Sequence, residues 1–162
     1  MQAINWDYLW DHLSGRFQLD AYSIHGPDHW RRVEQHAITL AEHAGGNIIV
    51  ARLFAAFHDV CRESDGGDRE HGPRAARLVM HLRGEFFDLP DADLALLQFA
   101  CRYHTSGLHS DDPTIGACWD ADRLDIWRAG HTPAERFMST DYGRLLARTG
   151  NYGLKFHPER DS

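Results

Sequence analysis

The sequence predicts an all-α protein built as a single helical bundle. Apolar residues recur at three- and four-residue steps along most of the chain, glycine and proline separate these segments, and no segment alternates apolar and polar residues over the length of a strand. The chain has 162 residues, of which 43% are apolar and 25% charged, as is usual for a globular domain. This length supports one core, so we expect one domain over residues 1–162.

The first three expected helices follow from the apolar spacing and its interruptions. Apolar and aromatic residues over 6–17 are spaced for an amphipathic helix. A second helix is expected to begin at Pro27, since proline suits the first helical turn, and to stop at Gly45–Gly46. Residues 48–60 are apolar on nearly every face, which is typical of a central helix buried on most sides.

The second half of the chain continues the helical pattern after a glycine-rich, acidic loop over 62–72. A helix is expected after Pro73, and Asp91 is a candidate cap for the next one. Thr114 is a candidate cap for a later helix that reaches about residue 129 and ends at Gly130. Shorter helices are expected after Thr132–Pro133 and over 142–148.

Charge and cysteine content exclude several classes of partner. The net charge is −7 and the basic residues are scattered, which argues against binding to a nucleic-acid polymer. No apolar stretch is long enough to span a membrane, so no membrane partner is expected. The three cysteines show no CxxC spacing, which favours a reducing, cytoplasmic compartment. The twelve histidines are the unusual feature, and they suggest a metal site.

Several of these polar residues occupy apolar positions of different helices. His58–Asp59 ends the most apolar helix, and a buried carboxylate costs several kcal/mol unless a cation or donors compensate it. His29 lies one turn into the second helix, and His104 and Asp122 fall on inward-facing stripes of later helices. Imidazole and carboxylate together suit zinc, manganese, iron or nickel. Convergence of these residues on a metal would offset each burial penalty.

The motifs that contain these residues resemble those of a known family. The segments HGPDHWRRV (25–33), AAFHDVCR (55–62) and DADRLD (120–125) follow the H…HD…D order of the HD-domain superfamily of metal-dependent phosphohydrolases. The resemblance implies a helical HD-type domain whose motif-bearing core spans about 20–130. It assigns metal binding to His29, His58, Asp59 and Asp122, with Asp122 preferred over Asp120.

Two further histidines bear on the number of ions. REHGPRAA (69–76) and YHTSG (103–107) resemble segments that supply two extra histidine ligands in binuclear members of the superfamily. Carried over, His71 and His104 would hold a second ion, with Asp59 bridging the two; a solvated loop position is the alternative for His71. One ion and two ions both remain open. The expected cofactor is a divalent metal, iron or manganese first, with magnesium, nickel, cobalt and zinc as further candidates.

The resemblance implies hydrolysis of a small phosphorylated substrate by a metal-activated hydroxide. A nucleotide is one candidate, as are other phosphoesters and pyrophosphates. Two alternatives stay open: a di-iron oxygenase with the same ligand set, and a non-catalytic protein that binds a ligand and contains a metal. The residues expected to be catalytic are Asp59, Arg62 and His104, and those expected to bind substrate are Arg62, Arg123, His25 and His109.

Overall fold

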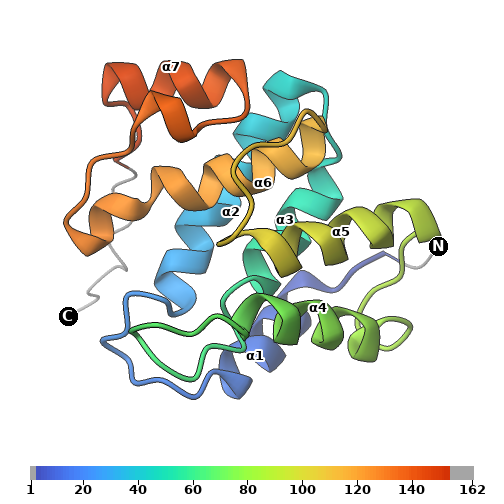
Figure 1. The fold of residues 1–162 in the computed structure, drawn as a ribbon. Helices are drawn as coiled ribbons and strands as arrows, with labels where there is room; N and C mark the ends of the chain where they lie inside the picture. Colours follow the sequence, from blue (N-terminus) through green and yellow to red (C-terminus); the bar gives the residue numbers. More distant parts are fainter. Residues whose placement is uncertain (1–2, 154–162) are drawn as a thin grey trace, which may run out of the picture.

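The computed structural model describes residues 3–153, and within this range it contains α- and 3₁₀-helices and no strand (Figure 1). The all-α prediction is therefore confirmed. The predicted single domain over 1–162 includes residues 154–162, which lie outside the described range. The helices are α1 (Trp6–Arg16), α2 (Pro27–Ala44), α3 (Ile48–Phe57), α4 (His71–Leu82), α5 (Asp91–Tyr103), α6 (Pro113–Leu124), η1 (Ile126–Ala129), η2 (Glu135–Phe137) and α7 (Asp141–Thr149).

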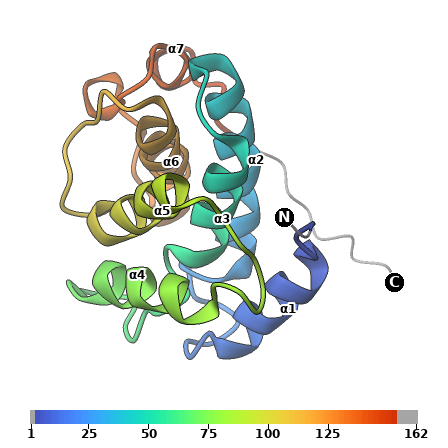
Figure 2. The same cartoon turned by 90° about the vertical axis from the view of Figure 1, so that its right-hand side faces the viewer.

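Helix α3 lies at the centre of the bundle, in contact with α2, α5 and α6. Seven of its ten residues are buried, because it is apolar on nearly every face. Helix α4 pairs with α5, and α7 packs on α6 and α2 at one end of the molecule. Figure 2 shows α7 at the top and α1 with α4 at the opposite end. The C-terminal end of α3 is thus enclosed by helices that come from distant parts of the sequence.

The structure corrects two expected starts in the middle of the chain. Helix α4 begins at His71, two residues before Pro73, because proline is tolerated within the first turn, where its missing N–H has no partner to lose. The expectation of a loop up to residue 72 was therefore wrong at its end. Helix α5 has Pro90 at its N-cap, and the Asp91 carboxylate accepts a hydrogen bond from Arg83 instead of capping the helix.

Helix α6 also differs from its expected ends. Its N-cap is Asp112, whose carboxylate accepts hydrogen bonds from two backbone N–H groups of the first turn, whereas Thr114 accepts one from the backbone of Asn47. The helix ends at Leu124, and the chain continues as the 3₁₀-helix η1 to Gly130, whose φ of 83° closes it. The short helix expected after Thr132–Pro133 is η2, which begins two residues later. None of the helices over residues 3–153 is both long and apolar enough to cross a membrane.

Candidate metal centre

The residues after α3 place one carboxylate between two pairs of imidazoles. The Asp59 side chain is almost fully buried, because it follows the apolar helix into the interior. Its Oδ2 lies 3.3 Å from His29 Nε2 and 3.6 Å from His58 Nε2. Its Oδ1 lies 3.3 Å from His71 Nε2 and 3.5 Å from His104 Nε2. Each carboxylate oxygen therefore faces its own histidine pair.

The first pair joins α2, the end of α3 and α6. The Nε2 atoms of His29 and His58 are 3.0 Å apart. Asp122 Oδ1, from α6, lies 3.2 Å from His29 Nε2 and 3.5 Å from His58 Nε2. Two imidazoles and two carboxylates thus surround one small volume, and His29, His58 and Asp59 could hold a metal ion there.

The second pair joins the first residue of α4 to the C-cap of α5. The Nε2 atoms of His71 and His104 are 2.8 Å apart, and with Asp59 they form a second group that could hold an ion. Both imidazoles are buried, so the alternative of a solvated loop position for His71 is wrong. We call the six residues around both volumes the His/Asp cluster: His29, His58, Asp59, His71, His104 and Asp122.

The second pair depends on a close approach between α4 and α5 that a glycine permits. A Cβ atom at Gly72 would lie 2.7 Å from the carbonyl oxygens of Cys101 and Arg102, which is too short for van der Waals contact. Any side chain here would push the start of α4, and with it His71, away from the end of α5. Gly72 is therefore a structural requirement for the pairing of His71 with His104.

We expect Gly72→Ala to weaken the second ion site. Overpacking of this kind costs about 1–3 kcal/mol, and the separated imidazoles would no longer share one ion. Chemical denaturation and metal stoichiometry measure the two effects. Gly67→Ala is the matched control, because nothing lies within 4 Å of a Cβ atom there. Wild-type stability and metal content in Gly72→Ala would contradict the role given to this glycine.

The hydrogen bonds of the Nδ1 atoms, which point away from the centre of the cluster, show whether the cluster fits a cation. In three of the histidines Nδ1 meets a backbone carbonyl, which can only accept, so Nδ1 carries the proton and the neutral ring points an Nε2 lone pair inward. The Nε2 lone pairs of His71 and His104, which face one another at 2.8 Å, repel unless a cation lies between them. The donor set therefore fits metal ions. The carbonyls belong to Ala55 for His58 (3.0 Å), Cys101 for His104 (2.7 Å) and Asp68 for His71.

The fourth imidazole is held by a carboxylate that the sequence analysis did not single out. Asp125 Oδ2 lies 2.7 Å from His29 Nδ1, and its Oδ1 accepts a hydrogen bond of 2.8 Å from Arg32 Nε. Asp125 is fully buried. Carboxylates that bind the outer nitrogen of a ligand imidazole orient the ring and raise its basicity. Its place in DADRLD, three residues after Asp122, was the available signal.

The charges of the cluster shift the pKa values of its members. Burial alone would lower the pKa of His29, but hydrogen bonds to Asp122, Asp125 and Asp59 raise it to about 9. Burial would raise the pKa of Asp59 and of Asp122, yet the surrounding imidazoles hold both well below the ordinary value. Without an ion, a proton on His29 thus supplies positive charge at the position where a cation fits.

Two further residues expected at the site do lie beside Asp59. His25 Nδ1 is 3.1 Å from Asp59 Oδ2, and the ring is buried. Arg62 Nε is 3.5 Å from Asp59 Oδ1 and has no hydrogen-bond partner among the described residues, while Nη1 donates to the carbonyls of Ser64 and Gly66. Arg62 therefore places positive charge next to Asp59 and also holds the loop after it.

The structure does not bring Arg123 and His109 into the cluster. The Arg123 guanidinium donates to three backbone carbonyls, those of Gly107, Leu108 and Phe137, so it ties the loop after α5 to the segment before α7. His109 is exposed, and its Nε2 donates to the Arg136 carbonyl. The contacts of both residues are structural ones.

Of two charged residues near Asp122 in the sequence, Asp120 and Arg128, only Arg128 lies beside its side chain. Asp120 is buried but faces the other way, where it accepts hydrogen bonds from the backbone of Ser139 and from the backbone and hydroxyl of Thr140. Arg128, which no sequence signal pointed to, has Nη2 4.0 Å from Asp122 Oδ1. Asp122 thus joins the cluster while Asp120 anchors the segment before α7.

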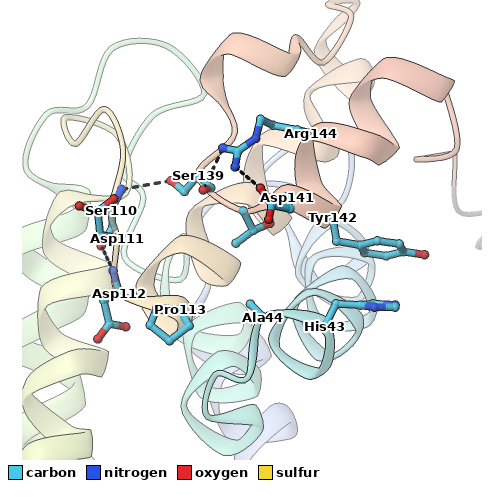
Figure 3. Close-up of a pocket in the computed structure, with 11 residues that line it drawn as sticks. His43, Ala44, Ser110, Asp111, Asp112, Pro113, Ser139, Asp141, Tyr142 and Arg144 are labelled. Atoms are coloured by element: carbon cyan, nitrogen blue, oxygen red, sulfur yellow. Dashed lines mark hydrogen bonds and ion pairs between the residues drawn. The ribbon is translucent and has the colours of Figure 1, made fainter.

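A separate cavity of about 340 Å³ lies between the end of α2, the start of α6 and the start of α7 (Figure 3). Three carboxylates line it, those of Asp111, Asp112 and Asp141, and the last is paired with Arg144. None of the lining residues belongs to the His/Asp cluster. Its acidic lining does not suit an anionic ligand.

Comparison with known proteins gives a match at the level of the fold. No family model and no curated protein matches the sequence. Among solved structures, the chain is similar to a predicted HD superfamily hydrolase from an uncultured Thermotogales bacterium, with a TM-score of 0.70 and 22% identity over 88% of this chain and 83% of that one. The chain therefore has the fold of an HD-superfamily protein, as the H…HD…D order in its sequence predicts, with a buried His/Asp cluster that could hold metal ions.

Proposed function

We propose that the protein is a metal-dependent hydrolase of small phosphorylated substrates. The observation that carries this proposal is the Asp59 carboxylate, which presents one oxygen to each of two histidine pairs. The likeness to a predicted hydrolase of the same fold supports it. A nucleotide, another phosphoester and a pyrophosphate all remain candidate substrates.

The distances support two sets of metal ligands. One ion would be held by His29, His58, Asp59 and Asp122, and a second by His71 and His104 with the other oxygen of Asp59. Manganese and iron are the ions we expect first, because both accept mixed imidazole and carboxylate ligands. A bound pair of divalent ions supplies Lewis acidity, lowers the pKa of water and neutralises phosphoryl oxygens.

The residues of the chain determine how a substrate reaches this centre. The side chain of Asp122 is 18% exposed, whereas those of His29, His58, Asp59, His71 and His104 are at most 3% exposed. A phosphoryl group therefore approaches past Asp122. Arg128, 4.0 Å from Asp122, supplies positive charge at this opening. Arg62 lies beside Oδ1 of Asp59, the oxygen that faces His71 and His104, and offsets the negative charge of this carboxylate.

A substrate panel under nitrogen tests the proposal. Protein loaded with manganese or iron should release phosphate or a phosphorylated product from at least one phosphomonoester, phosphodiester or pyrophosphate, and the metal-free protein should not. A di-iron oxygenase would instead consume oxygen and need iron, while a non-catalytic protein would turn over nothing in either atmosphere. Either result would overturn the hydrolase assignment.

The raised pKa of His29 predicts a proton-linked metal affinity. At pH 7 the metal-free protein holds this imidazole protonated, since its pKa of about 9 exceeds the ordinary 6.5, and an ion must displace that proton. Affinity at the first ion should rise about tenfold per pH unit from pH 7 and level off above about 9. Titration calorimetry in two buffers of different ionisation enthalpy should show about one proton released at pH 7.

The metal-free protein gives an independent check on the same group. A raised folded-state pKa stabilises the protein fully below pH 6.5, and this contribution is lost as the pH rises through about 9. The free energy of unfolding of the metal-free protein should therefore fall over this window. A metal affinity that does not change between pH 7 and 9 would contradict the raised pKa of His29 and its place among the metal ligands.

A further inference from the structure

A cavity of about 550 Å³ lies near the His/Asp cluster. Its walls come from the loop after α5, the end of α6 with η1, and the segment before α7. The volume is within the range usual for small-molecule sites. We call it the 131–138 cavity, after the segment that forms its largest wall; it is lined by Thr105, Gly107, Leu108, Arg123, Ile126, His131, Thr132, Pro133, Ala134, Arg136, Phe137 and Met138.

The cavity lies close to the His/Asp cluster, although no residue of the cluster lines it. Thr105 lines it, and the Thr105 hydroxyl lies 3.4 Å from His71 Nε2. Arg123 and Ile126, one and four residues after Asp122, line it from the other side. Asp122 is also the cluster side chain that solvent reaches most. The cavity is therefore within reach of the organic group of a molecule bound at the cluster through an anionic group.

The lining is apolar where it meets solvent. Leu108, Ile126 and Phe137 are 75%, 37% and 47% exposed, and the more buried Met138 lies beside them in the wall. Exposed apolar side chains gathered around a concave surface are typical of a binding site.

The charged groups of the cavity are basic. Among the described residues that line it, none is acidic. Arg123 donates to backbone carbonyls, and the Arg136 guanidinium lies 4.7 Å from the centre of the Phe137 ring. His131 also lines the cavity, so its basic side chains come from α6 and the segment before α7, while apolar side chains form most of the rest of the wall.

We propose that the 131–138 cavity binds the organic group of the substrate, and that this group has an apolar or aromatic surface. The inference rests on the proposed function, since it takes the phosphoryl group to bind at the cluster. It narrows the substrate class to phosphorylated compounds whose organic group offers such a surface. Phe137 and Leu108 are the side chains that such a group would cover.

Binding of two non-hydrolysable phosphonates tests this assignment. The probes are phenylphosphonate and methylphosphonate, added to zinc-loaded protein whose methionine methyl groups carry ¹³C. Phenylphosphonate should shift the NMR signal of Met138, which lines the cavity, and leave that of Met80, exposed on α4, unchanged. It should also bind about tenfold more tightly than methylphosphonate, because its ring leaves water.

Two phenylalanine variants test whether the preference for phenylphosphonate arises in the 131–138 cavity. Phe137→Ala should weaken phenylphosphonate about fivefold to tenfold and leave methylphosphonate unchanged, as expected for one aromatic contact. Phe99→Ala is the matched control, since Phe99 is 46% exposed against 47% for Phe137 and does not line the cavity. It should change neither affinity.

The outcomes separate this inference from the proposed function. Equal binding of the two phosphonates, or an unchanged affinity in Phe137→Ala, would overturn the role of the cavity even if phosphoesters are hydrolysed. Selective binding with a response of Met138 would support the cavity even if no phosphoester is hydrolysed. Binding of neither phosphonate would count against both.

Discussion

Replacing Asp59 by alanine is expected to empty both ion sites and abolish turnover while the helical fold remains. The carboxylate lies within 3.6 Å of the Nε2 atoms of four histidines, and Asp59 belongs to both groups of residues that could hold an ion. Removing a residue that hydrogen-bonds to a metal ligand typically lowers metal affinity about 10–100-fold. Removing Asp59, which would contact both ions, should lower it further. Elemental analysis after gel filtration should give near zero ions per chain.

The control for this experiment is another buried carboxylate. Asp120 is fully buried, but it binds Ser139 and Thr140 and does not face the cluster. Asp120→Ala should lower the free energy of unfolding and keep its metal. Circular dichroism should show both variants to be helical, since the apolar residues of α3 are untouched. Full metal occupancy in Asp59→Ala would contradict the proposed metal centre.

Replacing His104 by alanine is expected to lower the metal content from near two ions to near one. His104 and His71 form one pair on Asp59 Oδ1, whereas the other pair keeps its own ligands. Activity should fall steeply, because the ion that His71 and His104 would hold would supply part of the positive charge that offsets the phosphoryl group. Stoichiometry should be measured after loading with manganese or iron, so that a weakly held second ion is counted.

His36→Ala is the matched control for this second experiment. His36 is also a buried histidine, on α2, but its Nε2 bonds to the carbonyl of Tyr152 and not to the cluster. It should keep both ions. If the wild-type protein never holds more than one ion, His71 and His104 would be substrate-facing groups, and His104→Ala would change turnover without changing metal content.

The helices and the centre of the fold could be predicted from the sequence. The apolar run of α3 can be stable only in the interior, so the His58–Asp59 pair at its end had to be buried and compensated. The helical period places His104 on an inward face for the same reason. The resemblance to the HD superfamily implied the order of the candidate ligands, and the likeness in fold agrees with the helical fold that it implied.

Exact helix ends and the use of the arginines could not be predicted in this way. Thr114 and Asp112 are both good capping residues, and the choice between them depends on which backbone groups each one meets in three dimensions. Arg123 adjoins Asp122 in sequence, yet it points to carbonyls of two distant segments. Arg128 is farther from Asp122 in the sequence than Arg123 is, and yet its guanidinium lies beside the Asp122 carboxylate.

Which side chains must be buried could thus be inferred from the apolar period of each helix. Which atoms meet depends on the three-dimensional packing of the helices. The division of the Asp59 oxygens between two histidine pairs, the approach of α4 to α5 at Gly72, and the support of His29 by Asp125 all depend on how separate helices pack. Periodicity gives the face of a helix, but the partner of that face is set by contacts between residues far apart in the chain.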